Sequence, residues 1–332
     1  MACLSLPLVA MAQSSDREPA FRDNFYDVAA FGQEAWIVGY YGTLLHSSDG
    51  AATWMRQNSQ TAEALFRIVF PEKNMGWASG SYGTLLYTPD RGRNWHKQTT
   101  HTEEHLLGLH FLDNRLGWAV GSRGIVLRTE DGGATWLNAS VGEDVILNDV
   151  RFIGTKRGWA VGEFGRIYHS RDGGRSWAKQ KSPIEVSLIS GESRNLFRLL
   201  FGDANDAWAF GLDGAIVKTR DGERWELAKA TGAAAPATKR HHLFSAASFN
   251  GKKYAVGERG TILISPADRD QWKPAGFKIP PISLNGITFG TDGLGLIVGN
   301  RGLILRSQNG GIGWEQMEIV DAGRGKGESR SR

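Results

Sequence analysis

The chain has 332 residues, a formal net charge of +4 and a sequence pI near 9.1. Hydrophobic residues make up 41% of it, which is enough for a globular core and excludes a chain that is disordered throughout. The positive charge is mild and forms no long basic stripe, so we expect no nucleic-acid partner.

The N-terminal segment resembles the end of an export signal. Residues 2–10 are largely apolar, and Ala10 and Ala12 are the small residues that a signal peptidase reads. We interpret 1–12 as a truncated signal peptide and 13–24 as a lead-in, of which 17–24 could add a strand to the last repeat. The expected location is the periplasm, or the thylakoid lumen of a photosynthetic host. The single cysteine, Cys3, lies in the presumed signal, which excludes a cysteine zinc site and a disulfide scaffold.

One pattern then returns seven times: Trp, two apolar residues, Gly, two variable residues, Gly, an apolar run, Asp-Gly and Trp. The first four copies are 41 residues apart, measured between Gly39, Gly80, Gly121 and Gly162. The seven copies occupy 36–54, 77–95, 118–136, 159–177, 208–225, 254–272 and 296–314. A period of this length is typical of a repeat architecture.

Within one repeat, short β-rich runs alternate with turns. In the second copy the expected strands are 65–70, 76–80, 83–88 and 94–98, separated by Pro, Asn, Gly and Asp. Four strands in each of seven repeats predict an all-β, seven-bladed β-propeller with four-stranded antiparallel blades over 25–320. The Gly-, Ser- and Arg-rich segment 321–332 is expected to be a disordered basic tail.

The segment Ser/Thr-x-Asp-x-Gly-x-x-Trp is the Asp box. Its carboxylate can accept N–H bonds of its own turn, and its Trp can pack beside the hairpin, so we interpret the box as structural. The assigned residues are Asp49, Asp90, Asp131, Asp172, Asp221, Trp54, Trp95, Trp136, Trp177, Trp225 and Trp314. In the two last copies Asp268 is displaced by one position and Asn309 replaces Asp.

The Asp box, combined with the preceding Trp-x-x-Gly-x-x-Gly element, resembles the photosystem II stability and assembly factor family. The resemblance covers essentially the whole chain after the presumed signal. It implies an exported seven-bladed propeller that acts without catalysis and holds a newly made membrane subunit during complex assembly. It does not identify the client.

Strand order places the Gly-x-x-Gly loops and the connections between blades on one rim of the ring, opposite the Asp boxes. Loops on a rigid scaffold commonly carry recognition, and Tyr and Arg dominate binding hot spots. The predicted protein-binding residues are the second variable residue of each loop, namely Tyr41, Tyr82, Arg123, Phe164, Asp213, Arg259 and Arg301, and, with Arg67 and Arg151 on the first strands, Arg198. The alternative is that all are ordinary solvated residues.

An enzyme is the less favoured interpretation. A sialidase needs an arginine triad with a Tyr–Glu pair, and the N-terminal arginine motif of that class is missing. His101 and His105 flank two glutamates, but a third metal ligand is not evident. We therefore expect a monomeric protein with no catalytic site, metal or cofactor, whose partner is a protein client in a membrane or envelope complex. Peripheral membrane association is compatible with this interpretation, and a glycan-binding or receptor-like propeller is the alternative.

Overall fold

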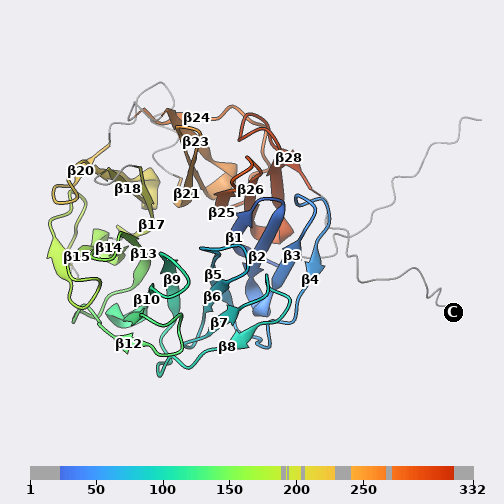
Figure 1. Ribbon diagram of the computed structural model, residues 1–332. Coiled ribbons are helices and arrows are strands. Elements are labelled where there is room, and N and C mark those ends of the chain that lie inside the picture. The colour runs from blue at the N-terminus through green and yellow to red at the C-terminus, as the bar shows by residue number, and fades with distance from the viewer. Residues whose placement is uncertain are drawn as a thin grey trace, which may run out of the picture.

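The computed structural model describes residues 23–187, 192, 194–202, 206–228, 241–266 and 271–317. It contains seven four-stranded antiparallel sheets arranged around a centre (Figure 1). In each sheet the first strand lies nearest the centre and the fourth lies at the outer edge. The predicted fold class is confirmed.

The blades follow the order of the chain, four consecutive strands to a blade. Blade 1 consists of β1 (Phe25–Phe31), β2 (Glu34–Gly39), β3 (Leu44–Ser47) and β4 (Met55–Arg56), and blade 2 of β5 (Leu65–Val69), β6 (Gly76–Gly80), β7 (Leu85–Thr88) and β8 (His96–Lys97). Blade 3 consists of β9 (Leu106–Phe111), β10 (Gly117–Gly121), β11 (Val126–Thr129) and β12 (Leu137–Asn138), and blade 4 of β13 (Leu147–Ile153), β14 (Arg157–Gly162), β15 (Ile167–Ser170) and β16 (Ala178–Gln180). Blade 5 consists of β17 (Leu196–Phe201), β18 (Ala207–Gly211), β19 (Ile216–Thr219) and β20 (Glu226–Leu227). Blade 6 consists of β21 (Leu243–Phe249), β22 (Lys252–Gly257), β23 (Ile262–Pro266) and β24 (Lys273–Pro274), and blade 7 of β25 (Leu284–Phe289), β26 (Gly295–Gly299), β27 (Ile304–Ser307) and β28 (Glu315–Gln316).

Burial follows the position of each strand in its blade. All five residues of β10 are buried, because this strand packs against neighbouring blades on both faces. Both residues of the edge strand β12 are exposed. Edge strands this short leave few unpaired backbone groups that could template the pairing of another chain.

The core lies between blades. Trp36, Val38 and Leu44 of blade 1 form one buried cluster with Leu65 and other residues of blade 2, and such clusters are repeated around the ring. In the first four copies the leading tryptophan also reaches the Asp-box turn of the next blade through its indole N–H. These bonds run from Trp36 to the carbonyl of Arg91, from Trp77 to Gly132, from Trp118 to Gly173 and from Trp159 to Gly222, at 2.9–3.1 Å. In the sixth copy the hydroxyl of Tyr254 donates to Gly310 at 3.0 Å. The repeated tryptophan therefore joins blades as well as filling the core.

The Asp boxes are closed hydrogen-bonded turns. In blade 2 the Thr88 hydroxyl donates to Asp90 at 2.9 Å, and the Asn94 N–H donates to the same carboxylate at 2.9 Å. Burial raises the pKa of this carboxyl, but hydrogen bonds from Asn94 and Thr88 outweigh burial, so its pKa is below the ordinary value. Asp49, Asp131, Asp172 and Asp221 are bonded in the same way, and Asn309 takes the position in blade 7. Asp268 lies outside the described residues.

Each Asp-box tryptophan packs at the interface between its own blade and the preceding blade. Trp54, Trp95, Trp136 and Trp225 are buried, whereas Trp177 and Trp314 are half-buried. Trp136 meets the ring of Phe111 edge-on at 5.9 Å and its N–H donates to Gln98 at 3.3 Å.

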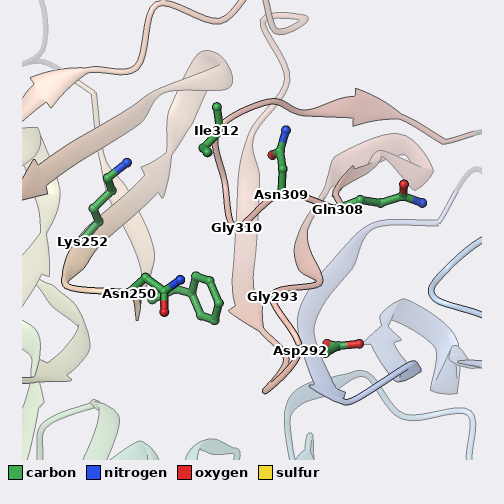
Figure 2. A pocket seen from close by; sticks show the side chains of 9 residues that line it. Asn250, Lys252, Asp292, Gly293, Gln308, Asn309, Gly310 and Ile312 are labelled. Carbon is green, nitrogen blue, oxygen red and sulfur yellow. The ribbon is translucent and has the colours of Figure 1, made fainter.

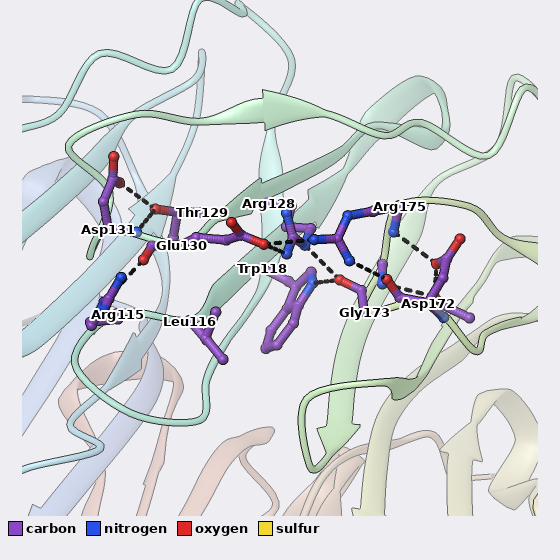
Figure 3. A network of polar contacts seen from close by, with 12 residues as sticks. Arg115, Leu116, Trp118, Arg128, Thr129, Glu130, Asp131, Asp172, Gly173 and Arg175 are labelled. Atoms are coloured by element: carbon purple, nitrogen blue, oxygen red, sulfur yellow. Dashed lines mark hydrogen bonds and ion pairs between the residues drawn. The ribbon is translucent and has the colours of Figure 1, made fainter.

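Polar side chains add to the seam between blades 3 and 4 on the Asp-box rim (Figure 3). The Gly173 carbonyl accepts from the Trp118 N–H at 3.0 Å and from Arg128 at 2.7 Å. Glu130 pairs with Arg128 and, at 2.9 Å, with Arg175 of the next blade. In Figure 3 Glu130 thus pairs with both Arg128 and Arg175, whereas Arg115 donates to the backbone carbonyl of Glu130 and Asp131 accepts from Thr129.

Blade 1 meets blade 7 directly. The Asn285 amide donates to the carbonyl of Phe25 at 2.7 Å, and the Gly302 N–H donates to the carbonyl of Asp23 at 2.8 Å. The lead-in thus contacts blade 7 through its last residues, whereas 13–22, with the presumed signal 1–12 and the tail 321–332, lie outside the described residues.

Candidate protein-binding face

We use the term Gly-x-x-Gly face for the rim formed by the loops between the second and third strands. In blade 3 the Ile125 N–H donates to the Ser122 carbonyl at 3.1 Å, with Arg123 at φ 53° and Gly124 at φ 66°. Two successive positive φ angles define a type I′ turn, the two-residue connection that fits the twist of a β-hairpin.

The first glycine of each loop is required by close approach of the backbone. A Cβ at Gly121 would lie 1.6 Å from the carbonyl oxygen of His105, the residue before β9. That carbonyl accepts the Ser122 N–H at 3.0 Å. The loop is therefore tied to the start of the innermost strand of its own blade.

The residue in the left-handed position is unusual. Type I′ turns favour Asn, Asp or Gly there, because other side chains pay about 1–2 kcal/mol for this backbone conformation. Only Asp213 among the seven is of a favoured type. The seven residues have φ between 49° and 58°: Tyr41, Tyr82, Arg123, Phe164, Asp213, Arg259 and Arg301. Six loops accept this strain and present an aromatic or basic side chain instead.

Most of these side chains are accessible. Tyr41 is 66% and Tyr82 62% exposed, and the Arg123 side chain is 74% exposed. Arg259 and Arg301 are also exposed. In ring order, blades 6, 7, 1, 2 and 3 therefore carry a continuous series of Arg, Arg, Tyr, Tyr and Arg, which we call the Arg–Tyr arc.

The two remaining positions differ. Phe164 of blade 4 is half-buried against the core between blades 3 and 4. Asp213 of blade 5 is exposed, but its N–H donates to His242 Nδ1 at 3.1 Å and its carboxylate lies 3.9 Å from the same ring. The structure thus unites five of the predicted residues in one arc and separates Phe164 and Asp213 from it.

Aromatic rings extend the arc inward. The Tyr82 N–H donates to His105 Nδ1 at 3.2 Å, and the two rings are 4.9 Å apart. His105 also meets Phe66, which lies 5.7 Å from Tyr26 at the start of β1. Sequence analysis missed Tyr26, Phe66 and the exposed Tyr40. Tyr26 and Phe66 lie at the bulges that open β1 and β5, which the repeat pattern does not show, whereas Tyr40 could have been found as the first variable residue of its Gly-x-x-Gly loop.

A pocket of about 270 Å³ lies beside Arg259 on the same face. Its wall is largely apolar and includes Ile262, Phe277 and Ile279, with Arg259 and His241 as its cationic and titratable members. It is suited to an apolar side chain that follows a negatively charged or hydrogen-bonding group.

Arg198 does not extend this exposed surface, contrary to expectation. It is 7% exposed and lies among charged residues of the first strands, 3.7 Å from Asp27. Arg67 is equally buried, and Arg151 pairs with Asp149. A bulge at the start of each first strand turns these positions inward, which the repeat pattern alone does not show.

The opposite rim offers a different surface. Figure 2 shows a pocket of about 270 Å³ between blades 6 and 7, with Lys252 and Asn250 on one side and Asp292 on the other. Asp292 is already hydrogen-bonded to Gln33 of blade 1. This carboxylate is therefore part of the blade seam.

Among the described residues, no group of three His, Asp, Glu or Cys side chains is close enough to hold a metal ion. Within the same residues, no helix is both long and apolar enough to cross a bilayer. The enlarged connections 182–195 and 228–242 lie partly outside the described residues.

Comparisons with known proteins agree with the fold. A family model described as photosynthesis system II assembly factor YCF48 matches residues 19–89, 55–129 and 88–188. A solved structure described as YCF48 bound to D1 peptide has a TM-score of 0.68 at 20% identity, covering 87% of this chain and 93% of that one. YCF48 from Cyanidioschyzon merolae gives 0.65 at 17%, covering 86% and 95%. The GH74 enzyme of Niastella koreensis gives 0.69 at 13% identity, covering 90% of this chain but 54% of the enzyme. A search of curated proteins finds no match.

Proposed function

Because the chain belongs to the photosynthesis system II assembly factor YCF48 family, we propose that it is a non-catalytic scaffold that binds a segment of a membrane-protein client on its Gly-x-x-Gly face. One observation carries the proposal. Six of seven type I′ turns hold an aromatic or basic residue in a left-handed conformation that disfavours it. Strain that recurs at one position of a surface is accounted for by what the side chains do there.

The arc favours an extended, acidic and partly aromatic or apolar ligand. Arg259, Arg301 and Arg123 supply charge, whereas Tyr41 and Tyr82 supply rigid surface between them. The pocket beside Arg259 adds an apolar socket. The peptide-bound YCF48 that shares this fold supports a peptide as the class of ligand.

The similarity to a GH74 enzyme concerns the fold alone. The Asp-box carboxylates, which are the most regular acidic groups of the chain, are occupied by hydrogen bonds in their own turns. They are therefore engaged as structural acceptors, and we assign no reaction to them.

A paired set of variants tests the binding face. Replacing Arg123, Arg259 and Arg301 together with Glu should abolish capture of the client in crosslinked membranes of the native host, measured by mass spectrometry. Exposed substitutions of this kind usually change stability by within about 0.5 kcal/mol, so the melting temperature should be unchanged. Binding to the wild-type protein should also weaken with rising salt, because exposed charges are screened beyond about 8 Å.

The matched control replaces Arg93, Lys156 and Arg224, which are exposed on the Asp-box rim, with Glu. Arg91 and Arg175 are unsuitable because they form ion pairs between blades. If the control loses the client and the first variant does not, the client binds the Asp-box rim and the proposed face is wrong. If Tyr41→Ala and Tyr82→Ala abolish binding, but the arginine substitutions and salt have no effect on it, the result would favour an uncharged ligand such as a glycan.

The proposed location is outside the cytoplasm, on the strength of the apolar segment 2–10 and the small residues Ala10 and Ala12. Intact-mass measurement of the protein from its native host should give a mature N-terminus at or near Gln13. A cytoplasmic protein that retains 2–12 would contradict this proposal.

A further inference from the structure

The centre of the ring contains a group of buried charges that the client-binding face does not use. Each first strand begins with a β-bulge, and the residue after the bulge lies at an equivalent inner position in every blade. These residues are Asp27, Arg67, Gly108, Asp149, Arg198, Ser245 and Gly286, all of them buried. We call this set, with Arg151 and His110 beside it, the channel cluster.

The carboxylates of the channel cluster first satisfy backbone groups. Asp27 accepts the Ile68 N–H of the next blade at 3.2 Å, and Asp149 accepts the Leu199 N–H at 2.9 Å. Ser245 makes the corresponding bond to Ile287 at 3.3 Å. These bonds join blades 1 to 2, 4 to 5 and 6 to 7, and in both aspartates they use Oδ2.

The arginines approach the carboxylates, but their distances are longer than those of hydrogen bonds. Arg67 Nη1 is 3.9 Å and Arg198 Nη2 3.7 Å from Asp27 Oδ1, and Arg198 Nε is 4.0 Å from Asp149 Oδ2. Charge-assisted hydrogen bonds are shorter, about 2.7–2.9 Å. Within the described part of the chain, Nε of Arg67 and both Nε and Nη1 of Arg198 are buried without an acceptor.

The charges of the cluster do not cancel. The seven first strands carry three arginines (Arg67, Arg151, Arg198), two aspartates (Asp27, Asp149) and one histidine, His110. Burial, reinforced by Arg151, lowers the pKa of His110 to about 3, so this ring is neutral at physiological pH. Burial and the charge of Arg198 lower the pKa of Arg67 to about 10, at which it is still protonated. Three positive and two negative charges leave an excess of one positive charge on the first strands. The Arg151 side chain is 25% exposed, whereas Arg67 and Arg198 are buried, where a charge that lacks hydrogen-bond partners is costly.

We propose that the channel cluster binds one small monovalent anion, of the chloride type, between Arg67 and Arg198. One excess charge calls for one negative charge, and the free N–H groups of the two guanidiniums supply the donors. Both guanidiniums lie within 4 Å of the same oxygen, Asp27 Oδ1, so two positive groups converge on one carboxylate. Arg67 also donates to the Phe197 carbonyl of blade 5 at 3.3 Å, so an anion held here would brace blades on opposite sides of the ring.

Bromide is the probe for this site. Crystals of the protein grown in sodium bromide should show an anomalous peak between the guanidiniums of Arg67 and Arg198. In solution, the melting temperature should rise saturably with sodium chloride, relative to sodium gluconate at equal ionic strength. Neither measurement involves a client, so its failure is separate from a failure of the proposed function.

Variants identify the residues involved. Arg198→Met leaves two positive and two negative charges, and should abolish both the bromide peak and the chloride-dependent rise. Arg67→Met serves the same purpose if the first variant does not fold. Arg93→Met, on the exposed Asp-box rim, should give the same bromide peak and the same chloride-dependent rise as the wild type. Ordered water alone between the two guanidiniums, with bromide confined to the outer surface and a melting temperature indifferent to chloride, would overturn the proposal.

Discussion

The left-handed residue of the Gly-x-x-Gly loops shows a conflict between local stability and surface chemistry. At Arg301 the φ angle is 58° and the side chain is exposed, so little packing compensates for the strained backbone. At Asp213 the residue type fits the turn, and this loop lies outside the Arg–Tyr arc. The loops that depart from the favoured turn residues form the arc, with Phe164 as the half-buried exception.

Arg301→Asn is expected to stabilise the protein by about 0.5–1 kcal/mol, because Asn tolerates the left-handed region better than Arg. The same substitution should weaken client binding. Urea denaturation and a client-capture assay measure the two effects on one variant. Asp213→Asn is the control and should leave stability nearly unchanged. A destabilised Arg301→Asn protein would show that the arginine has a packing role.

Unlike the exposed Arg301, Trp136 is a core residue: it is 7% exposed and packs on Phe111. Trp136→Ala should lower the free energy of unfolding by about 3–5 kcal/mol, the cost of truncating a buried large aromatic. The neighbouring Leu137 is 60% exposed, so Leu137→Ala should have little effect. Equal effects of the two substitutions in chemical denaturation would remove Trp136 from the core.

At the scale of the element, the Asp box is a turn whose stability depends on an ionised carboxylate. Burial opposes ionisation of Asp49 and Asp172, but hydrogen bonds from Thr53 and Ser176 and their neighbours lower both pKa values to about 2, below the ordinary 3.8. A lowered folded-state pKa stabilises the native state above pH 3.8, and this contribution is lost as the pH falls towards 2. Several boxes of this kind act together around the ring.

We therefore expect the urea midpoint to be constant from pH 6 to about 4 and to fall steeply between about pH 4 and 2. Asp172→Asn should reduce that steepness, because one titrating box has been removed. The box of blade 7 already carries Asn309, which shows that an amide can take this position. A midpoint that does not change down to pH 2 would contradict a stabilising role for the ionised boxes.

The elements were predictable to the extent that they repeat. The run 65–70 was expected as a strand and is observed as Leu65–Val69, because Gly, Pro and Asp mark the turns in every copy. Edge strands were expected too long: 94–98 is reduced to His96–Lys97, since nothing packs on its outer side. The rim position of Arg123 followed from strand order, whereas the inward direction of Arg198 depended on a bulge that leaves no mark in the repeat.

At the scale of the whole molecule, one rim holds the blades together and the other presents the exposed side chains. The Asp-box rim joins blades through indole bonds and ion pairs, as at Trp118 and Glu130. The Gly-x-x-Gly face carries the exposed Arg–Tyr arc on turns that are each fastened to an innermost strand. A rigid ring therefore presents the arc with little freedom of its own, which reduces the entropy lost when a ligand binds.

The junction of blades 1 and 7 has a consequence for chain order. Every blade is made of consecutive strands, and both ends of the described chain meet at this junction, where Asp23 bonds to Gly302 and Met317 packs against the cluster that contains Phe25. Among the strands of residues 23–317 that the structure describes, no sheet combines strands from both ends of the chain. A circular permutant that opens between any two blades, with the old ends joined by a linker, would regenerate the same seven sheets and the same cyclic order of side chains. The geometry of the ring is thus independent of where the polypeptide starts, and natural or engineered shuffling can move the termini away from a bound client.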